Sequence, residues 1–303
     1  MSPLIACTPK TLPRGAWIGA AATATRINPV NHPPIERLIR VMPAFHPTPE
    51  HIAVLTTKYW HSGGVHLTVG FLDDPAADLR ARILLHMNAW GRTANVNFSE
   101  TATDPQVRIA RESTGYWSYL GTDVLSIPKD QQTLNLQAFT MDTPESEFHR
   151  VVRHETGHTM GFPHEHMRKE LVDRIDRAKA IVFFGQTQGW SEAEVIAQVL
   201  TPIEESSLLG TAHADPNSIM CYQIPGTITK DGQPIAGGLD IDPQDAAFAA
   251  QIYPRPKSVA VVPPRKSPGK RSTKPLKMTA KKTAKRSAKK SVAKAPARKR
   301  GRR

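Results

Sequence analysis

The stretch that most constrains this chain runs from residue 154 to residue 165 and reads His-Glu-Thr-Gly-His-Thr-Met-Gly-Phe-Pro-His-Glu. Histidines four positions apart lie one turn apart on the same face of a helix, so His154 and His158 can direct two imidazole nitrogens at one ion, at about 2.1 Å each. Glu155 is adjacent, where its carboxylate can hold a metal-bound water and accept the proton of that water. The pattern predicts a helix that carries a catalytic metal.

The glycine at position 161 predicts a sharp turn that brings a third histidine to the metal. Glycine tolerates a positive φ, so the chain can turn sharply at Gly161 and bring His164 back towards the other two histidines. Three protein nitrogens leave one coordination position open, which is typical of catalytic rather than structural zinc. Zinc in such a site polarises a scissile carbonyl and lowers the pKa of its water to about 7. The predicted cofactor is Zn²⁺, and the predicted reaction is hydrolysis of peptide bonds.

A second motif downstream, Ser-Ile-Met-Cys-Tyr at residues 218–222, makes the prediction more specific. A histidine pair of this spacing occurs by chance in unrelated helices, but the two motifs together match the metzincin pattern of an extended zinc helix followed by a Met-turn. The segment GFPHEHMR at residues 161–168 and the SIMxY sequence resemble the astacin branch of the metzincins. The resemblance extends over roughly residues 50 to 254.

The resemblance to astacins implies roles for individual residues. Tyr222 corresponds to a mobile zinc ligand that swings away to stabilise the tetrahedral intermediate; the alternative is a tyrosine that only packs under the site. Met220 would form an apolar floor beneath the metal, because a thioether is a poor partner for zinc among imidazoles. Glu165 in the family anchors the N-terminus released by processing, whereas a local ion pair with Arg168 is the alternative. Since the family uses the tyrosine, we expect His166 to lie outside the ligand set.

The chain also departs from the family. Astacins are secreted and contain disulfides, whereas this chain has two cysteines, Cys7 and Cys221, which we do not expect to form a bridge. Without a disulfide framework, the sequence does not specify whether the protein resides in an oxidising or a reducing compartment. The Phe-x-Gly-Asp segment by which many astacin propeptides block zinc is missing upstream. Thr8, Pro9 and Lys10 do not resemble a known cysteine-switch motif, so we do not expect Cys7 to cap the metal.

The fold class that the resemblance implies is α+β, with a twisted and mainly parallel sheet, the zinc helix and a C-terminal half that holds the Met-turn. Alternating, β-branched runs predict strands at residues 65–72, 106–110 and 133–139. In metzincins a strand ahead of the zinc helix forms the upper rim of the cleft. If the 133–139 run is that edge strand, a substrate peptide would bind by strand addition.

Helices are predicted from spacing and capping signals. After residues 73–75, apolar residues recur at helical spacing and predict one apolar face, made of Leu79, Ile83, Met87 and Trp90. The zinc helix begins near residues 143–146, with a proline and acidic residues in its first turn. The insert before the Met-turn is largely helical, over 171–184 and, after a capping box at residues 191–194, as far as residue 200. These helices either wall the cleft or form a packed appendage.

Charge divides the chain into parts. We predict a leader or propeptide-like segment at residues 1–50, the catalytic domain at 51–254 and a disordered basic tail at 255–303. The tail holds 20 of the 40 Lys and Arg and none of the 27 Asp and Glu, so it carries +20, whereas the remainder carries 20 − 27 = −7. Without aromatics or an apolar period it has nothing to offset the entropy of ordering.

The tail resembles the C-terminal tails of linker histones, which bind nucleic acid through its phosphates. Nucleic acid or another polyanion is therefore a predicted partner, in addition to the protein or peptide substrate. An anionic membrane or polysaccharide surface, the acidic catalytic domain of a neighbouring molecule and a merely solubilising extension are the alternatives. A second function class also stays open, in which the tail is the active part and the zinc domain serves as a scaffold or as a protease that the tail delivers.

Localisation is not specified by the sequence. The short, weakly apolar stretch at residues 16–22 lacks an early basic region and is a poor signal peptide, which leaves the cytoplasm and non-classical secretion open. We find no run of the roughly 18–20 apolar residues that a transmembrane helix needs. Residues 23–50 are expected either to pack across the domain or to serve as a propeptide.

Overall fold

The computed structural model describes residues 7–8, 10–41, 48–202 and 213–256. The chain divides into two compact units, residues 1–257 and residues 258–303, and only the first contains described residues. Residues 257–303 of the basic tail lie outside the described residues, so the disorder of the tail stays a prediction.

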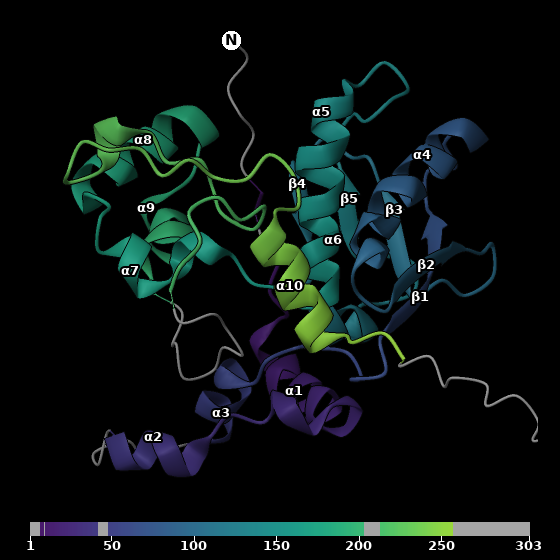
Figure 1. The fold of residues 1–303 in the computed structure, drawn as a ribbon, viewed down its shortest axis with the longest axis horizontal. Coiled ribbons are helices and arrows are strands. Elements are labelled where there is room, and N and C mark those ends of the chain that lie inside the picture. Colours follow the sequence, from purple (N-terminus) through teal and green to yellow (C-terminus); the bar gives the residue numbers. More distant parts are fainter. Residues whose placement is uncertain (1–6, 9, 42–47, 203–212, 257–303) are drawn as a thin grey trace, which may run out of the picture. The chain divides into compact units, whose positions relative to one another are not determined.

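A twisted sheet of five strands organises the first unit (Figure 1). The strands follow the order β2-β1-β3-β5-β4, and every neighbouring pair is parallel except β4 with β5. The strands are β1 (Val65–Phe71), β2 (Val96–Glu100), β3 (Val107–Ala110), β4 (Tyr116–Ser118) and β5 (Leu134–Leu136). The predicted α+β class with a mainly parallel sheet is confirmed. The strands β2 and β4 are additional to the three predicted ones.

The 133–139 run is not the edge strand of the sheet. Residues 134–136 form β5, which lies between β3 and β4 inside the sheet. The edge is β4, because the chain turns back at Gly115, whose φ is 87°, and places β4 antiparallel on the outer side of β5. A segment from the beginning of the chain then pairs with β4 in parallel, through bridges from Cys7 to Tyr116 and from Lys10 to Tyr119.

Helix α4 (Ala77–Met87), which a 3₁₀ turn continues over Asn88–Arg92, covers one face of this sheet. The predicted apolar face is confirmed, since all four of its residues are buried: Leu79, Ile83, Met87 and Trp90. The indole Nε1 of Trp90 donates a hydrogen bond to the carbonyl of Arg153 at 2.9 Å. The sheet layer is thereby bonded directly to the helix that carries the histidine motif.

That helix is exposed at its start and wholly buried where it carries the histidines. It begins with α5 (Glu145–Glu147), continues through a π-helical turn over Phe148–Val152 and ends as α6 (Arg153–Met160). The predicted start and the acidic first turn are confirmed, but Pro144, predicted within the first turn, is the N-cap and lies just before it. Every residue of α6 is buried. A helix enclosed on all sides cannot show an amphipathic period, so its sequence signal lies in the histidine spacing instead.

The predicted helical insert forms a second, smaller layer. It consists of α7 (Lys169–Val172), α8 (Arg177–Gln188), α9 (Glu192–Val195) and a π-helical turn over Ile196–Leu200. The capping box of Ser191 and Glu194 is confirmed. These helices gather on one side of α6 and enclose their own apolar cluster, whereas α4 lies on the other side (Figure 1). Helix α10 (Pro243–Ile252) contributes Ala249 to the main core.

The leader packs against the rest of the unit. It contains α1 (Trp17–Ile27) and α2 (Ile35–Val41), and α3 (Pro49–Leu55) begins at its end and continues beyond residue 50. The stretch that reads as a poor signal peptide lies mostly within α1, which buries alanines on one face. The amide of Asn31, itself buried, donates to the carbonyl of Tyr59 at 2.8 Å and accepts from its N–H at 2.8 Å. No helix within the described part of the chain has the length and apolarity to cross a bilayer.

The carboxylate of Asp245 joins α10 to the predicted Met-turn. One of its oxygens accepts from the hydroxyl of Ser218 at 2.6 Å, and the other accepts from the backbone N–H of Ile219 at 2.9 Å. Asp245 also completes a capping box with Asp242 at the start of the helix. This single buried side chain therefore fixes both the helix start and the turn.

We predict that Asp245→Asn lowers the free energy of unfolding by about 1–3 kcal/mol, because an amide offers one acceptor oxygen and leaves a buried donor of the turn without a partner. Chemical denaturation followed by circular dichroism measures the change. The matched control is Gln244→Ala, one residue away on the exposed side of the helix, which should change the stability by less than about 0.5 kcal/mol. Equal stability of Asp245→Asn and the parent protein would contradict the prediction.

Candidate metal centre

The turn after α6 brings the three motif histidines together. Gly161 ends the helix in the left-handed region with a φ of 100°, and its N–H donates back to carbonyls of the last turn. A Cβ at this position would lie 2.9 Å from the carbonyl oxygen of Lys58, so the site requires glycine for space as well as for φ. The chain leaves the helix at once and reaches His164 three residues later.

The Nε2 atoms of the three histidines converge. Nε2 of His164 lies 3.2 Å from Nε2 of His154 and 3.0 Å from Nε2 of His158. Backbone carbonyls hold the other ring nitrogen of two of these residues: Ile219 faces Nδ1 of His154 at 2.6 Å, and Phe162 faces Nδ1 of His158 at 2.8 Å. A carbonyl only accepts, so each of these Nδ1 atoms carries the proton and each Nε2 presents a lone pair.

This donor set fits zinc. Burial lowers the pKa of His154 to about 4 and lowers the pKa values of His158 and His164 well below the ordinary value, so all three rings are neutral at pH 7. Of the three Nε2 atoms that face one another, only that of His164 can carry a proton, so at least two lone pairs point at the same space. A cation at their centre turns this repulsion into ligation, and imidazole is a preferred ligand of Zn²⁺.

Met220 lies directly beneath the histidine helix. A Cβ added to Gly157 would come within 2.4 Å of the Met220 sulfur and 3.4 Å of the Trp90 ring. The methionine is buried and belongs to the main hydrophobic core. The helix therefore rests on the turn through a position that only glycine fits.

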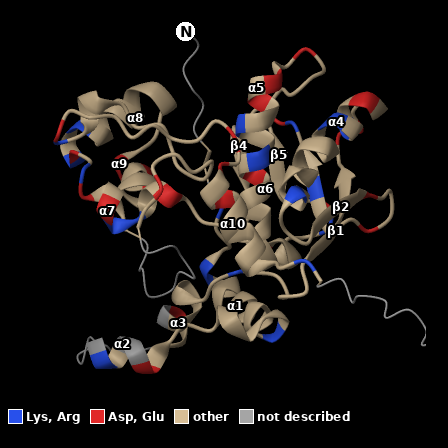
Figure 2. Cartoon of the chain, viewed as in Figure 1, with Lys and Arg blue, Asp and Glu red and all other residues tan. Residues whose placement is uncertain are grey.

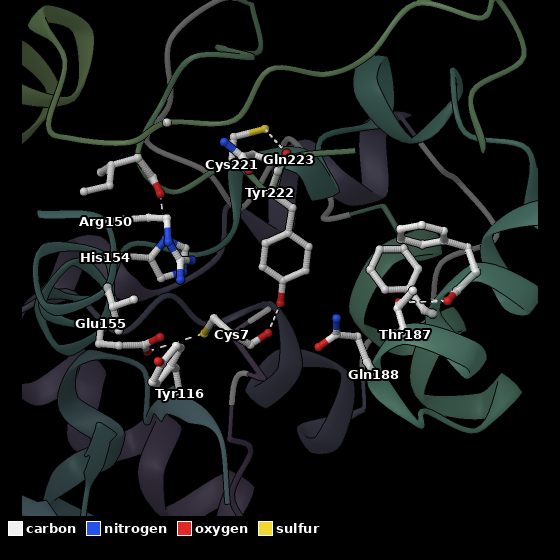
Figure 3. A pocket seen from close by; sticks show the side chains of 15 residues that line it. Cys7, Tyr116, Arg150, His154, Glu155, Thr187, Gln188, Cys221, Tyr222 and Gln223 are labelled. Carbon is white, nitrogen blue, oxygen red and sulfur yellow. Dashed lines mark hydrogen bonds between the residues drawn. The ribbon is translucent and has the colours of Figure 1, made fainter. Parts of the chain in front are cut away.

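The carboxylate of Glu155 lies beside the histidines, and a cysteine from the leader points at it (Figure 3). The thiol of Cys7 donates to Oε2 of Glu155 at 3.4 Å, whereas Oε1 is buried without a hydrogen-bond partner among the described residues. Burial raises the pKa of Glu155 to about 8, and the hydrogen bond from Cys7 and the charge of Arg150 offset part of this rise.

The position of Cys7 is therefore not the one expected. The sequence favoured a leader cysteine away from the metal, but Cys7 is buried, and its sulfur belongs to one cluster of possible ligand atoms with His154, His158 and His164. The expectation failed because the residues that follow Cys7 match no known motif, while the pairing with β4 that brings Cys7 here joins positions far apart in the sequence. Both cysteines are free thiols, as expected.

Tyr222 also faces the centre. Its hydroxyl donates a hydrogen bond to the carbonyl oxygen of Cys7, and its ring lies 4.4 Å, centroid to centroid, from the ring of His164. The Tyr222 ring also stacks on the ring of His166, with 3.9 Å between the centroids. His166 itself is turned away from the ligand cluster, with its Nε2 at 2.9 Å from the carbonyl of Gln198. It supports the tyrosine and does not join the ligands.

Glu165 makes local contacts in this structure. Its Oε1 lies 3.6 Å from the guanidinium of Arg168 and accepts from the backbone N–H of Asp215 at 3.0 Å. Burial raises the pKa of Glu165, and the hydrogen bond from Asp215 and the charge of Arg168 act in the opposite direction. These contacts correspond to the local alternative considered for this residue.

A cavity of about 180 Å³ opens next to the centre, and Figure 3 shows the side chains around it. Four residues of α8 supply part of its wall, so the insert contributes to the site: Phe183, Phe184, Thr187 and Gln188. Arg150 also lines this cavity, although it belongs to neither sequence motif. Its guanidinium is held by Glu147 at 2.7 Å. Its spacing of four residues from His154 on the same helix was the available signal.

A second group of side chains, made of His86, Glu145 and His149, also brings possible metal ligands together. Nε2 of His86 lies 3.1 Å from Oε1 of Glu145, and Nε2 of His149 lies 3.4 Å from the same oxygen. The guanidinium of Arg153, however, donates to Nδ1 of His86 at 3.3 Å, which leaves the ring proton on Nε2. An Nε2 that carries a proton does not ligate, so this group is a polar network that joins α4 to the histidine helix.

Comparisons with known proteins agree with this geometry. A family model described as Astacin, a family of peptidases, matches residues 55–228. Zinc metalloproteinase nas-27 of Caenorhabditis elegans is 34% identical over 90 residues, which are 29% of this chain and 19% of that relative, so the chain spans only a small part of its length. A solved structure of myroilysin superimposes with a TM-score of 0.62 and 29% identity over 66% of this chain and 97% of the matched chain. A crystal structure of myroilysin has a TM-score of 0.50 and 30% identity, over 65% and 86% of the two chains.

We predict that Gly157→Ala destabilises the protein by about 1–3 kcal/mol, because the new methyl group forces Met220 and the turn out of their packing. Thermal unfolding and the zinc content after dialysis measure the effect, and both should fall. Gly185→Ala is the matched control on α8, where the nearest atom lies at 3.5 Å, an ordinary contact. The control should be neutral or slightly stabilising; a Gly157→Ala protein with unchanged stability and zinc content would contradict the packing argument.

Proposed function

Because this chain belongs to the astacin family of zinc metallopeptidases, we propose that it hydrolyses internal peptide bonds of proteins and that His154, His158 and His164 hold its zinc. The observation that carries the proposal is the convergence of three histidine Nε2 atoms, 3.0 and 3.2 Å apart, beside the carboxylate of Glu155. Bound zinc supplies a Lewis acid for the scissile carbonyl and lowers the pKa of its water to about 7.

Glu155 acts as the general base in this proposal. Its buried carboxylate accepts the proton of the attacking water, and the same carboxyl group then donates that proton to the departing amine nitrogen. The hydrogen bond that Glu155 accepts from the Cys7 thiol supports this role, because it brings a donor from a peptide segment within reach of the carboxylate. The second oxygen, which has no partner among the described residues, is available to a water.

Tyr222 stabilises the oxyanion in this proposal. A phenol is neutral at pH 7 and can donate a hydrogen bond to charge that develops on the carbonyl oxygen. Its hydroxyl already donates to one peptide carbonyl in the cleft, that of Cys7. The stacking on His166 holds the ring at the edge of the centre, from which the hydroxyl can also approach the zinc as a further ligand when no substrate is bound.

Supporting roles complete the proposal. Met220 is the apolar floor, Gly161 the turn and Glu165 a local anchor for the segment after His164. The outer edge of β4 is the proposed site for an extended substrate, since a segment of the same chain adds to this edge by backbone hydrogen bonds. In the proposed division of the chain, residues 51–254 form the catalytic domain that follows a leader at residues 1–50.

We predict that Glu155→Gln abolishes hydrolysis while zinc remains bound, because the amide keeps the shape of the side chain but accepts no proton. The assay is release of fluorescence from labelled, denatured casein, measured for the intact protein and after limited trypsin digestion that is stopped with an inhibitor. A chelator should also abolish the signal, and Glu192→Gln, at an exposed position of α9, should not. Hydrolysis by Glu155→Gln at the parent rate, or none by the parent protein in either form, would reject the proposal.

A second candidate function rests on the segregation of charge. The tail, residues 255–303, carries +20, whereas the first 254 residues carry −7, and the described residues show both signs of charge spread over helices and loops (Figure 2). We propose that the tail binds nucleic acid or another polyanion and brings the peptidase to proteins on such a surface.

We predict that deletion of residues 258–303 removes polyanion binding but leaves casein hydrolysis unchanged. The deletion starts there because Arg255 donates to the carbonyl of Ala94 at 3.4 Å within the folded unit. Binding of labelled duplex DNA of arbitrary sequence, measured at several salt concentrations, should weaken steeply with salt for the full chain, because phosphate contacts release counterions. Loss of hydrolysis on deletion would favour the scaffold alternative, and salt-independent binding would contradict the electrostatic account.

A further inference from the structure

The cavity of about 180 Å³ beside the metal centre lies on the side of the proposed general base. His154 and Glu155 line it, whereas His158 and His164 do not. In the proposed function Glu155 donates a proton to the departing amine nitrogen, so the residue that carries this nitrogen leaves on the side of Glu155. We name the cavity the amine-side pocket, since the side chain that enters it belongs to the residue after the scissile bond.

Aromatic and aliphatic side chains form much of the wall of the amine-side pocket. Phe183 and Phe184 of α8 contribute two rings that meet edge to face, 5.2 Å apart, and Phe184 stacks in turn on Trp190 at 5.3 Å. Val151 and Ile219 add aliphatic surface. An apolar cavity of about 150 Å³ is enough to hold a benzene ring. The pocket therefore has the size and the lining for one aromatic side chain, which would extend the aromatic cluster of α8.

Arg150 brings a positive charge to this wall. Figure 3 shows it on the opposite side of the Tyr222 ring from Thr187 and Gln188. A guanidinium in a largely apolar pocket would bind the carboxylate of an acidic side chain through two parallel hydrogen bonds. With Arg150 free, the pocket would select aspartate or glutamate.

Glu147 cancels the charge of Arg150. Nε of Arg150 donates to Oε1 of Glu147 at 3.0 Å, and Nη2 donates to Oε2 at 2.7 Å, so the two N–H groups that would hold a second carboxylate side-on are taken. The two side chains are 15% and 30% exposed, and salt screens such a partly buried pair less than an exposed one. An acidic side chain in the pocket would lose its hydration, gain no charged partner and meet the carboxylate of Glu155 in the same wall.

The pair belongs to the helix that carries the metal ligands. Glu147 is the last residue of α5, and Arg150 lies in the π-helical turn that follows, so the two side chains are neighbours on one face of the helix. Glu147 itself does not line the pocket. It acts on the pocket through Arg150, as a positioning residue.

We propose that the amine-side pocket selects a large uncharged side chain, aromatic above all, in the residue after the scissile bond, and that Glu147 sets this selection by cancelling the charge of Arg150. This inference rests on the proposed function, because it names the class of peptide that the same site takes. It assigns a role in specificity to a residue outside both sequence motifs.

The experiment uses the full chain, intact and after limited trypsin digestion, with two quenched fluorescent peptides that differ only in having Phe or Asp after the scissile bond. Mass spectrometry of the products verifies which bond is cleaved. For the parent protein, kcat/KM should be about tenfold or more higher for the Phe peptide than for the Asp peptide. Glu147→Gln should reduce this ratio by about tenfold, mainly through faster hydrolysis of the Asp peptide, and added salt should weaken the gain.

Two further variants test the route through Arg150. Glu145→Gln is the matched control, since it removes the same charge two residues earlier, where the carboxylate pairs with Arg82 at 2.7 Å. It should leave the ratio unchanged. The double variant Glu147→Gln with Arg150→Gln should return the ratio to that of the parent protein, because no guanidinium is left to uncover. A loss of structure alone would not restore specificity in this way, and circular dichroism with zinc analysis verifies that each variant is folded and loaded.

A second measurement does not depend on turnover. Two peptide hydroxamates, which bind zinc through the hydroxamate group, carry a benzyl or a carboxymethyl side chain at the position that enters the pocket. Calorimetry on the zinc-loaded proteins should give a dissociation constant about tenfold or more lower for the benzyl compound with the parent protein, and a smaller difference with Glu147→Gln.

The outcomes separate the two proposals. Equal kcat/KM for the two peptides, or equal or absent binding of the two hydroxamates by the parent protein, overturns the selection by the pocket. A ratio that stays the same in Glu147→Gln, or changes as much in Glu145→Gln, overturns the role of Glu147. If the hydroxamates are discriminated as expected while no form of the protein hydrolyses peptide or casein, the pocket stands and the proposed peptidase function fails.

Discussion

The repulsion among three buried imidazole lone pairs is the constraint around which the molecule is built. His154 and His158 are held in one tautomer by the carbonyls of Ile219 and Phe162, so their Nε2 atoms face His164 without protons to separate them. Such a cluster is unfavourable without a cation and strongly favourable with one. Ile219 belongs to the Met-turn and Phe162 to the turn at Gly161, so both turns take part in fixing the ligands.

The rest of the first unit supports those two turns. Asp245 fixes the Met-turn to α10, while Met220 fills the space that Gly157 leaves under the histidine helix. Beside Met220, Trp90 bonds that helix to the layer of α4 and the sheet. Each link is a buried, specific contact between elements distant in the sequence. The sheet layer and the Met-turn thus meet at the helix that carries the histidines.

The sequence predicts those features whose signal is local. The spacing of His154, His158 and His164, with a glycine before the last, is a property of eleven residues, and the capping box at Ser191 is a property of four. Strand β4 has three residues, too few for a period, and its place at the edge depends on how the chain crosses after Gly115. The approach of Cys7 to Glu155 joins residues 148 positions apart, a contact that no local pattern encodes.

The edge of the sheet brings the binding of an extended peptide close to the chemistry of the site. An edge strand presents backbone groups to which any extended segment can add, whether it is a substrate or part of the same chain. Thr8 and Lys10 add to β4 in this way, through the carbonyls of Tyr116 and Ser118, and the Tyr222 hydroxyl donates to the carbonyl of Cys7. A segment of the same chain binds at high effective concentration, so even modest contacts compete well with a free peptide. Because a substrate would need the same carbonyls of β4 and the same hydroxyl, the two cannot bind together.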